Sequence, residues 1–130
     1  MHNFVMVIDD SATIRKVLEV SLKREGFIVV SFPDGIEALR WLNQPNVPTP
    51  ALIFLDVNMP KIDGYSLASY IKHKNKFQNT TIVMLTRRDG VVDRLRARLA
   101  GATHYLTKPC KTEDIVNVVQ SYLTPVLEYS

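Results

Sequence analysis

Five short apolar runs alternate with five amphipathic stretches along the chain, and this alternation limits the possible folds more than any other feature. The predicted strands are Phe4–Ile8, Ile28–Ser31, Ala51–Leu55, Thr81–Leu85 and Thr103–Leu106. Strands joined through helices must run parallel, with right-handed crossovers. Strands that are apolar throughout suit a sheet covered on both faces. We therefore expect an α/β fold, a three-layer sandwich built on a five-stranded parallel sheet with five helices.

The stretches between the runs have apolar residues three and four positions apart, which predicts helices. Their apolar residues fall within Ile14–Leu22, Ile36–Leu42, Leu67–Ile71, Val92–Leu99 and Ile115–Leu123. In the fourth helix the apolar positions are Val92, Leu95 and Leu99. Gly26 stands where a helix C-cap is expected. Asn43–Pro50 holds three prolines and is predicted to be a loop.

Length and composition fit one globular domain. The chain has 130 residues, 46% of them hydrophobic and 22% charged, which is enough for a core without disulfides or metals. We expect a single domain over residues 1–130, with its core at about 4–123 and a tail at 124–130. The single cysteine fits a cytoplasmic protein, and the N-terminal apolar run is too short for a signal peptide or a membrane span. The net charge of +3 lacks a long basic run, which disfavours nucleic-acid binding.

Polar side chains stand where four of the predicted strands end. Asp9 and Asp10 follow the first strand, Asp56 the third, Thr86 the fourth, and Lys108 comes shortly after the fifth. Ligands of open parallel sheets bind outside the carboxyl ends of the strands, so we expect these side chains to meet at one edge. Three carboxylates and one ammonium give a local formal charge of −3 + 1 = −2, which a divalent cation would balance. Oxygen ligands favour Mg²⁺, with Mn²⁺ also suitable, over zinc.

This set of side chains is suited to phosphoryl transfer. Asp56 is a candidate nucleophile, because carboxylates can form aspartyl phosphates. A metal ion and Lys108 would offset the charge on the phosphoryl oxygens. Each acid alone could equally cap a helix, but that explanation does not account for polar residues at four strand ends.

Four motifs, in their order and spacing, resemble the receiver domain of two-component response regulators over about residues 4–123. They are Val5–Ser11, Leu55–Gly64, Met84–Thr86 and Tyr105–Pro109. The resemblance implies a flavodoxin-like fold with strand order 2-1-3-4-5. It also implies that the protein is a switch in a phosphorelay.

The resemblance implies roles for individual residues. Asp56 would be the phosphoacceptor. Asp9 and Asp10 would hold Mg²⁺ together with the Asp56 carboxylate and the backbone carbonyl of Asn58.

Four more positions receive roles in the same way. Lys108 would pair with the phosphoryl group and Thr86 would hydrogen-bond to it. Tyr105 would move inward when Thr86 moves. The peptide bond between Lys108 and Pro109 would be cis, as is typical of the family and largely confined to proline.

The implied partners are proteins. A histidine kinase or a phosphotransfer protein would donate the phosphoryl group from a phosphohistidine, and the chain would catalyse its own phosphorylation and dephosphorylation without being a conventional enzyme. Phosphorylation would shift a two-state equilibrium and change the surface of the fourth helix, fifth strand and fifth helix, which a target protein reads. The segments Asp9–Lys16 and Leu99–Thr103 resemble bacterial regulators of twitching motility and phototaxis.

Several residues depart from the family pattern. Arg87 stands where relatives usually have a small residue, and we hypothesise that its side chain shields the phosphoryl group and slows dephosphorylation; the alternative is that it points into solvent.

Arg94 and Arg98, one helical turn apart, form either a basic patch for an acidic partner or an ordinary solvated face. Cys110 is expected to be a small core residue.

Other functions remain as alternatives. A receiver-like protein-binding module that works without phosphorylation usually lacks an acid or the lysine, and all are present here. A hydrolase of the haloacid-dehalogenase type needs Asp-x-Asp after the first strand, a spacing that Asp9 and Asp10 lack. A flavin-binding protein needs a loop of Ser, Thr and Gly at that place, where acidic residues would repel phosphate unless a metal intervened.

Overall fold

The computed structural model describes residues 3–88 and 90–123 of the chain. Its elements are β1 (Phe4–Ile8), α1 (Ala12–Arg24), β2 (Ile28–Phe32), α2 (Gly35–Leu42), β3 (Leu52–Asp56), α3 (Gly64–Lys72), the 3-10 helix η1 (Asn75–Phe77), β4 (Thr81–Thr86), α4 (Val91–Leu99), β5 (His104–Thr107) and α5 (Thr112–Tyr122). The strands are all parallel, in the order β2-β1-β3-β4-β5. The predicted flavodoxin-like sandwich is therefore confirmed.

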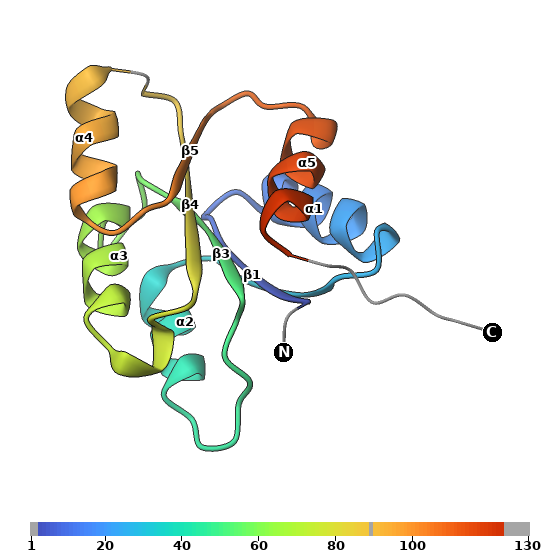
Figure 1. Cartoon of the computed structure of the whole chain (residues 1–130), viewed down its shortest axis with the longest axis horizontal. Helices are drawn as coiled ribbons and strands as arrows, with labels where there is room; N and C mark the ends of the chain where they lie inside the picture. Colours follow the sequence, from blue (N-terminus) through green and yellow to red (C-terminus); the bar gives the residue numbers. More distant parts are fainter. Residues whose placement is uncertain (1–2, 89, 124–130) are drawn as a thin grey trace.

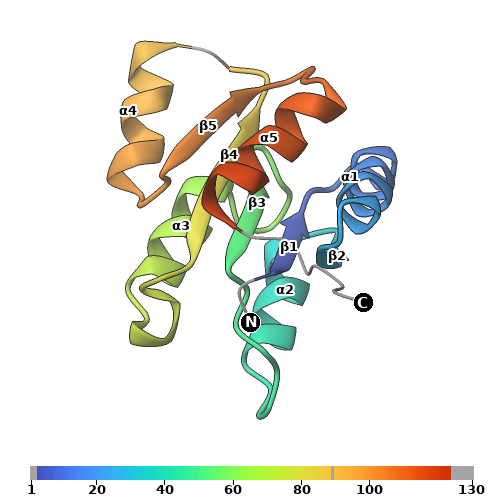
Figure 2. The same cartoon turned by 45° about the vertical axis from the view of Figure 1, so that its right-hand side comes forward.

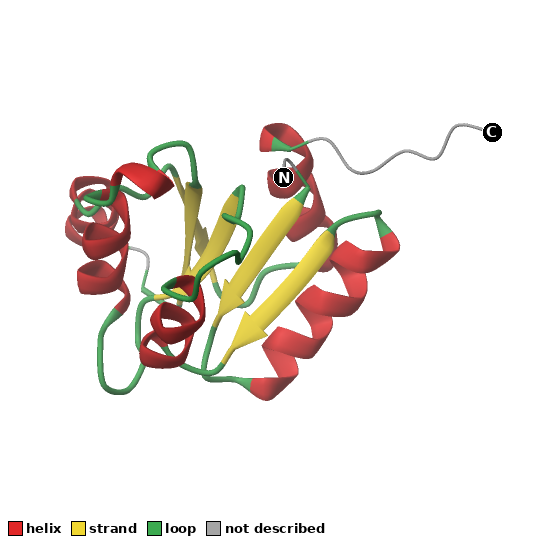
Figure 3. Cartoon of the chain, turned by 90° about the horizontal axis from the view of Figure 1, so that it is seen from below, coloured by secondary structure: helices red, strands yellow, loops and turns green. Residues whose placement is uncertain are grey.

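The sheet is the middle of three layers. Helices α2, α3 and α4 cover one face and α1 and α5 cover the other (Figure 1), and the view from below shows helices on both sides of the strands (Figure 3). Helices α1 and α5 lie side by side (Figure 2). This arrangement leaves the carboxyl ends of the strands open at one edge, where the polar residues were predicted to meet.

Successive residues of a strand point to opposite faces, so a doubly covered sheet has two cores. Strand β1 shows this directly. Met6 and Ile8 pack in the core on the side of α2, α3 and α4, whereas Val5 and Val7 pack in the core on the side of α1 and α5. All four side chains are fully buried, which explains why the strand is apolar throughout.

Side-chain caps fix where three helices begin. Ser11, Asp34 and Asp63 precede α1, α2 and α3, and each side chain accepts a hydrogen bond from a backbone N–H in the first turn. Such caps satisfy amides that have no partner within the helix. At the other end of α1, Gly26 has a φ of 91°, a left-handed conformation that glycine adopts without strain.

Helix α4 packs differently from the sequence pattern. The sequence pattern predicts Val92, Leu95 and Leu99 as the buried apolar face of this helix, yet they are 69%, 53% and 78% exposed. The helix buries Ala97 instead. The helix thus packs through a small residue, and its larger apolar side chains project outward. No helix within residues 3–88 and 90–123 is long and apolar enough to cross a membrane.

Candidate functional site

Three carboxylates converge at the open edge of the sheet. Ligand atoms of Asp9, Asp10 and Asp56 all lie within 4.8 Å of one another. Asp9 is 0% exposed and Asp56 is 5% exposed, whereas Asp10 faces solvent. The convergence follows from the sheet order, because β1 and β3 are neighbours and end at the same edge.

Local hydrogen bonds hold the two buried carboxylates. Asp9 Oδ1 accepts a hydrogen bond from the Ser11 N–H at 2.9 Å, and the Asp9 carbonyl accepts one from Arg15 Nη1 at 2.6 Å. Asp56 Oδ1 accepts one from the Asn58 N–H at 3.2 Å. Ser11 therefore both caps α1 and positions Asp9, a role that its place directly after the two aspartates could have suggested.

Lys108 provides the cation at the site. Its Nζ lies 2.7 Å from Asp9 Oδ2 and 3.6 Å from Asp56 Oδ1, with the lysine side chain 12% exposed. Its backbone N–H donates to the Thr86 carbonyl at 2.6 Å. The peptide bond between Lys108 and Pro109 is cis.

The site carries uncompensated negative charge. The pKa of Asp56 is raised to about 6, first because burial disfavours its charged form and second because Asp9 is negative; the charge of Lys108 opposes the shift. A single ammonium thus does not offset three carboxylates. The donor set consists of carboxylate oxygens, which fits Mg²⁺ or Mn²⁺, and Asp9, Asp10 and Asp56 would hold the ion.

Thr86 and Tyr105 are both tied to the backbone of Arg88. The fully buried Thr86 accepts a hydrogen bond at its Oγ1 from the Arg88 N–H at 3.1 Å. The Tyr105 hydroxyl donates to the Arg88 carbonyl at 2.7 Å. Tyr105 is half-buried, and burial is the main reason why its pKa is raised. A movement of the backbone after Thr86 would therefore reach both side chains.

Gly64 is a site residue that sequence reasoning did not single out. A Cβ at this position would lie 2.5 Å from the Asp56 carbonyl oxygen and 2.7 Å from Val57 Cα. Only a glycine lets the first turn of α3 lie this close to the end of β3. The Gly64 N–H also donates to the Val57 carbonyl at 2.9 Å.

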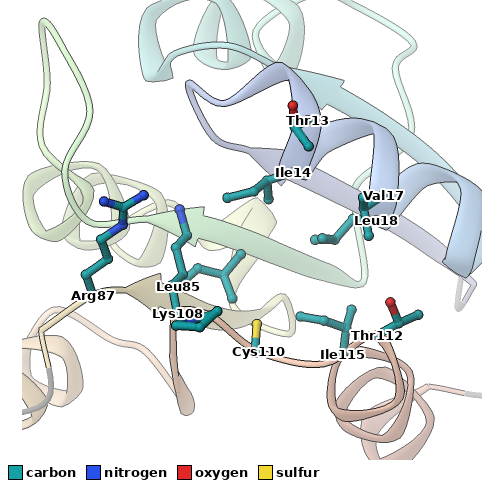
Figure 4. A pocket seen from close by; sticks show the side chains of 11 residues that line it. Thr13, Ile14, Val17, Leu18, Leu85, Arg87, Lys108, Cys110, Thr112 and Ile115 are labelled. Atoms are coloured by element: carbon teal, nitrogen blue, oxygen red, sulfur yellow. The ribbon is translucent and has the colours of Figure 1, made fainter.

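Two hollows open at this edge of the molecule. A pocket of about 320 Å³ holds the acidic site and is lined by Asp10, Ser11, Ile14, Asp56, Asn58, Arg87 and Lys108. A more apolar groove of about 600 Å³ runs between α1 and α5, with Ile14, Val17, Cys110 and Ile115 among its walls (Figure 4). Cys110 is half-buried, so it lines the groove and is not a fully buried core residue.

Comparison with known proteins agrees with this geometry. Residues 5–120 match the model of the response regulator receiver domain family. The chain belongs to this family. Receiver domains work in two-component signalling, with histidine kinases as partners.

Individual receiver-containing proteins match most of the chain. Protein PilG of Pseudomonas aeruginosa is 38% identical over 125 residues, which cover 94% of this chain and 90% of PilG. The chemotaxis response regulator CheY4 of Vibrio cholerae has a TM-score of 0.86 at 28% identity, covering 95% of this chain and all of the CheY4 structure. The Mn²⁺-bound form of response regulator Rcp1 has a TM-score of 0.79 at 26% identity, covering 98% of this chain and 99% of Rcp1.

Proposed function

We propose that the protein is a phosphorylation-dependent switch in which Asp56 accepts a phosphoryl group from a histidine kinase or a phosphotransfer protein. One observation carries the proposal. The buried Asp56 carboxylate lies within 4.8 Å of two further carboxylates and 3.6 Å from an ammonium. Such a site suits an anionic group only when a cation is added, which is the requirement of metal-assisted phosphoryl transfer.

Each residue has a defined part in the reaction. A carboxylate oxygen of Asp56 attacks the phosphorus of the donor phosphohistidine, the P–N bond breaks, and the imidazole leaves and takes up a proton. Lys108 binds a phosphoryl oxygen, and Thr86 donates its hydroxyl to another. Asp9, Asp10, Asp56 and the carbonyl of Asn58 would hold Mg²⁺ or Mn²⁺, which offsets negative charge on the phosphoryl oxygens. Hydrolysis of the aspartyl phosphate ends the signal: water attacks the phosphorus, the bond between phosphorus and Asp56 breaks, and inorganic phosphate leaves.

We propose that the donor protein binds at the groove between α1 and α5. The groove shares Ile14, Arg87 and Lys108 with the acidic pocket, so a protein that brings phosphohistidine to Asp56 would come close to it. The apolar walls of the groove suit an apolar helix face on that donor.

We propose that the target protein binds on the outer surface of α4. Val92, Leu95 and Leu99 are exposed there, and the arginine side chains Arg94 and Arg98 are exposed on the same helix. This surface suits a target with apolar and acidic side chains. We further propose that the protein acts in the cytoplasm, in a pathway of bacterial motility or phototaxis; the similarity to PilG supports the motility pathway.

Intact-protein mass spectrometry after incubation with acetyl phosphate and Mg²⁺ tests the proposal. The wild type should gain one phosphoryl group, and Asp56→Asn or a chelator should prevent the gain. Asp63→Asn is the matched control, because Asp63 caps α3 outside the acidic cluster, and it should be phosphorylated like the wild type. Absence of a gain with both acetyl phosphate and the P–N donor phosphoramidate would contradict the proposal.

A further inference from the structure

We infer that Arg87 is a second phosphoryl-binding cation of this site, and that its guanidinium holds the phosphoryl group on Asp56 and slows its hydrolysis. The inference rests on the proposed function and deepens it, because it assigns the lifetime of the signal to one side chain.

Arg87 lies beside the acidic pocket, just after the end of β4. Arg87 directly follows Thr86, the last residue of β4. Strand β4 lies beside β3, and β3 ends at Asp56. Arg87 and Lys108 both line the acidic pocket. In the close view, the Arg87 guanidinium and the Lys108 ammonium extend toward the same side, at the end of β3 (Figure 4).

Within the described part of the chain, the Arg87 guanidinium has no partner. Arg87 is exposed, and among residues 3–88 and 90–123 no ion pair or hydrogen bond holds its guanidinium. Arg88 differs, because its Nη1 lies 4.0 Å from Asp93 Oδ1. Lys108 is likewise already paired with Asp9. Arg87 is thus an exposed cation that lines the pocket, and within the described residues it has no pair to break when it turns to an incoming anion.

The net charge of the phosphorylated pocket depends on Arg87. Asp9, Asp10 and Asp56 contribute −3, and Lys108 and Arg87 contribute +2, which leaves −1. Phosphorylation replaces the −1 of Asp56 with about −2 on the phosphoryl group, and a divalent cation adds +2, so the phosphorylated site is close to neutral. Without Arg87 it would keep a net charge of about −1. A neutral site holds a phosphoryl group more strongly than an anionic one.

The chemistry of arginine explains the effect on hydrolysis. A guanidinium presents two parallel N–H groups to the oxygens of a phosphoryl group, which a lysine ammonium cannot do. In hydrolysis, water must reach the phosphorus on the side opposite the departing Asp56 oxygen, and it arrives from the solvent, to which Arg87 is exposed. A guanidinium bound there stabilises the phosphorylated state and occupies the path of the water.

The test measures binding of beryllofluoride, a phosphoryl analogue, by ¹⁹F NMR with Mg²⁺ present, and the half-life of the phosphorylated protein by intact mass. Arg87→Ala should weaken beryllofluoride binding by roughly tenfold and shorten the half-life by a similar factor. Arg87→Lys should restore part of the affinity, because it keeps the charge but loses the fork. Arg40→Ala is the matched control, since it removes the same charge from an exposed position on α2, outside the pocket, and both quantities should stay at the wild-type value.

The outcomes separate the inference from the function on which it rests. A wild type that binds beryllofluoride and is phosphorylated, beside an Arg87→Ala variant with unchanged affinity and an equal or longer half-life, would overturn the role of Arg87 and leave Asp56 as the acceptor. Equal losses in Arg87→Ala and Arg40→Ala would also overturn it, because the effect would then come from net charge. A wild type that neither binds beryllofluoride nor accepts a phosphoryl group would overturn both.

Discussion

The Lys108 ammonium lies 2.7 Å from Asp9 Oδ2, in a pair that is almost completely shielded from water. The same nitrogen is 3.6 Å from Asp56 Oδ1, so the lysine is held mainly by a predicted metal ligand and not by the predicted phosphoacceptor. A cation that binds Asp9 has to compete with Lys108. Lys108 would then be available for an anion on Asp56.

This competition predicts the effect of Lys108→Ala on metal binding. Removal of the ammonium raises the local negative charge and frees Asp9, so Mg²⁺ should bind roughly tenfold more tightly, a gain of about 1.4 kcal/mol. Isothermal titration calorimetry with MgCl₂ measures this directly. Lys108→Arg, which keeps the positive charge, is the control and should stay near the wild-type affinity. Unchanged or weaker Mg²⁺ binding by Lys108→Ala would show that the lysine does not compete.

The raised pKa of Asp56 predicts that Asp56→Asn stabilises the metal-free protein. The pKa of about 6 in the folded state lies above the ordinary value of 3.8, so the ionised carboxylate destabilises the fold. The destabilisation is complete above pH 6 and fades as the pH falls through 6 toward 3.8. At neutral pH the variant should therefore be more stable by roughly 2 kcal/mol.

Urea denaturation of both proteins in the presence of a chelator measures this difference. The gap between wild type and Asp56→Asn should narrow when the pH is lowered to about 5. Added Mg²⁺ should stabilise the wild type more than the variant, because the variant lacks one ligand charge. A variant that is less stable than the wild type at neutral pH would contradict this reading of the acidic site.

The sequence was sufficient to predict much of this site. The strand order places Asp9, Asp10 and Asp56 together, because the last residues of neighbouring parallel strands share an edge. The contact through Gly64 was not foreseen, since it depends on how closely α3 approaches β3, and a sequence pattern does not give that distance. The exposure of the apolar face of α4 could not be predicted either, because an apolar helical stripe has the same sequence pattern whether it packs against a sheet or faces solvent.

The close approach at Gly64 predicts a strong effect of a single methyl group. In Gly64→Ala the new Cβ would collide with backbone atoms of Asp56 and Val57, which cannot rotate away. We expect a loss of roughly 2 kcal/mol of stability and slower phosphorylation, because the end of β3 must shift. Thermal and urea denaturation test the first effect, and the rate of mass gain with acetyl phosphate tests the second.

Gly90→Ala is a matched control for this substitution. A Cβ at Gly90 would meet the Asp93 side chain at 3.0 Å and, among the described residues outside its own helix and chain neighbours, no backbone atom within 4 Å, and the Asp93 side chain can move. The control should change stability by less than about 0.5 kcal/mol. Equal effects of the two substitutions would show that the contact between Gly64 and Asp56 is not special.

The cap of α2 predicts a pH-dependent contribution to stability. The Asp34 side chain accepts a hydrogen bond from the Glu37 N–H at 2.9 Å, which is the main reason why the pKa of Asp34 is lowered below 3.8. Its contribution is complete above the ordinary pKa and is lost as the pH falls through the lowered value. Asp34→Ala should cost about 1 kcal/mol at neutral pH and less in acid, whereas Asp34→Asn should retain most of the cap.

Denaturation curves of the three proteins between about pH 7 and about pH 3 measure this contribution. A cost of Asp34→Ala that stays constant over this range would mean that packing, and not the charged cap, accounts for it.

The most direct test of the central claim is to identify the residue that carries the phosphoryl group. The protein is phosphorylated with acetyl phosphate and Mg²⁺, reduced with borohydride, which converts an aspartyl phosphate to homoserine, and then mapped by peptide mass spectrometry. Homoserine at position 56 and at no other aspartate is the predicted result. Homoserine elsewhere, or none in a protein that has gained a phosphoryl group, would contradict the assignment of Asp56 as the phosphoacceptor.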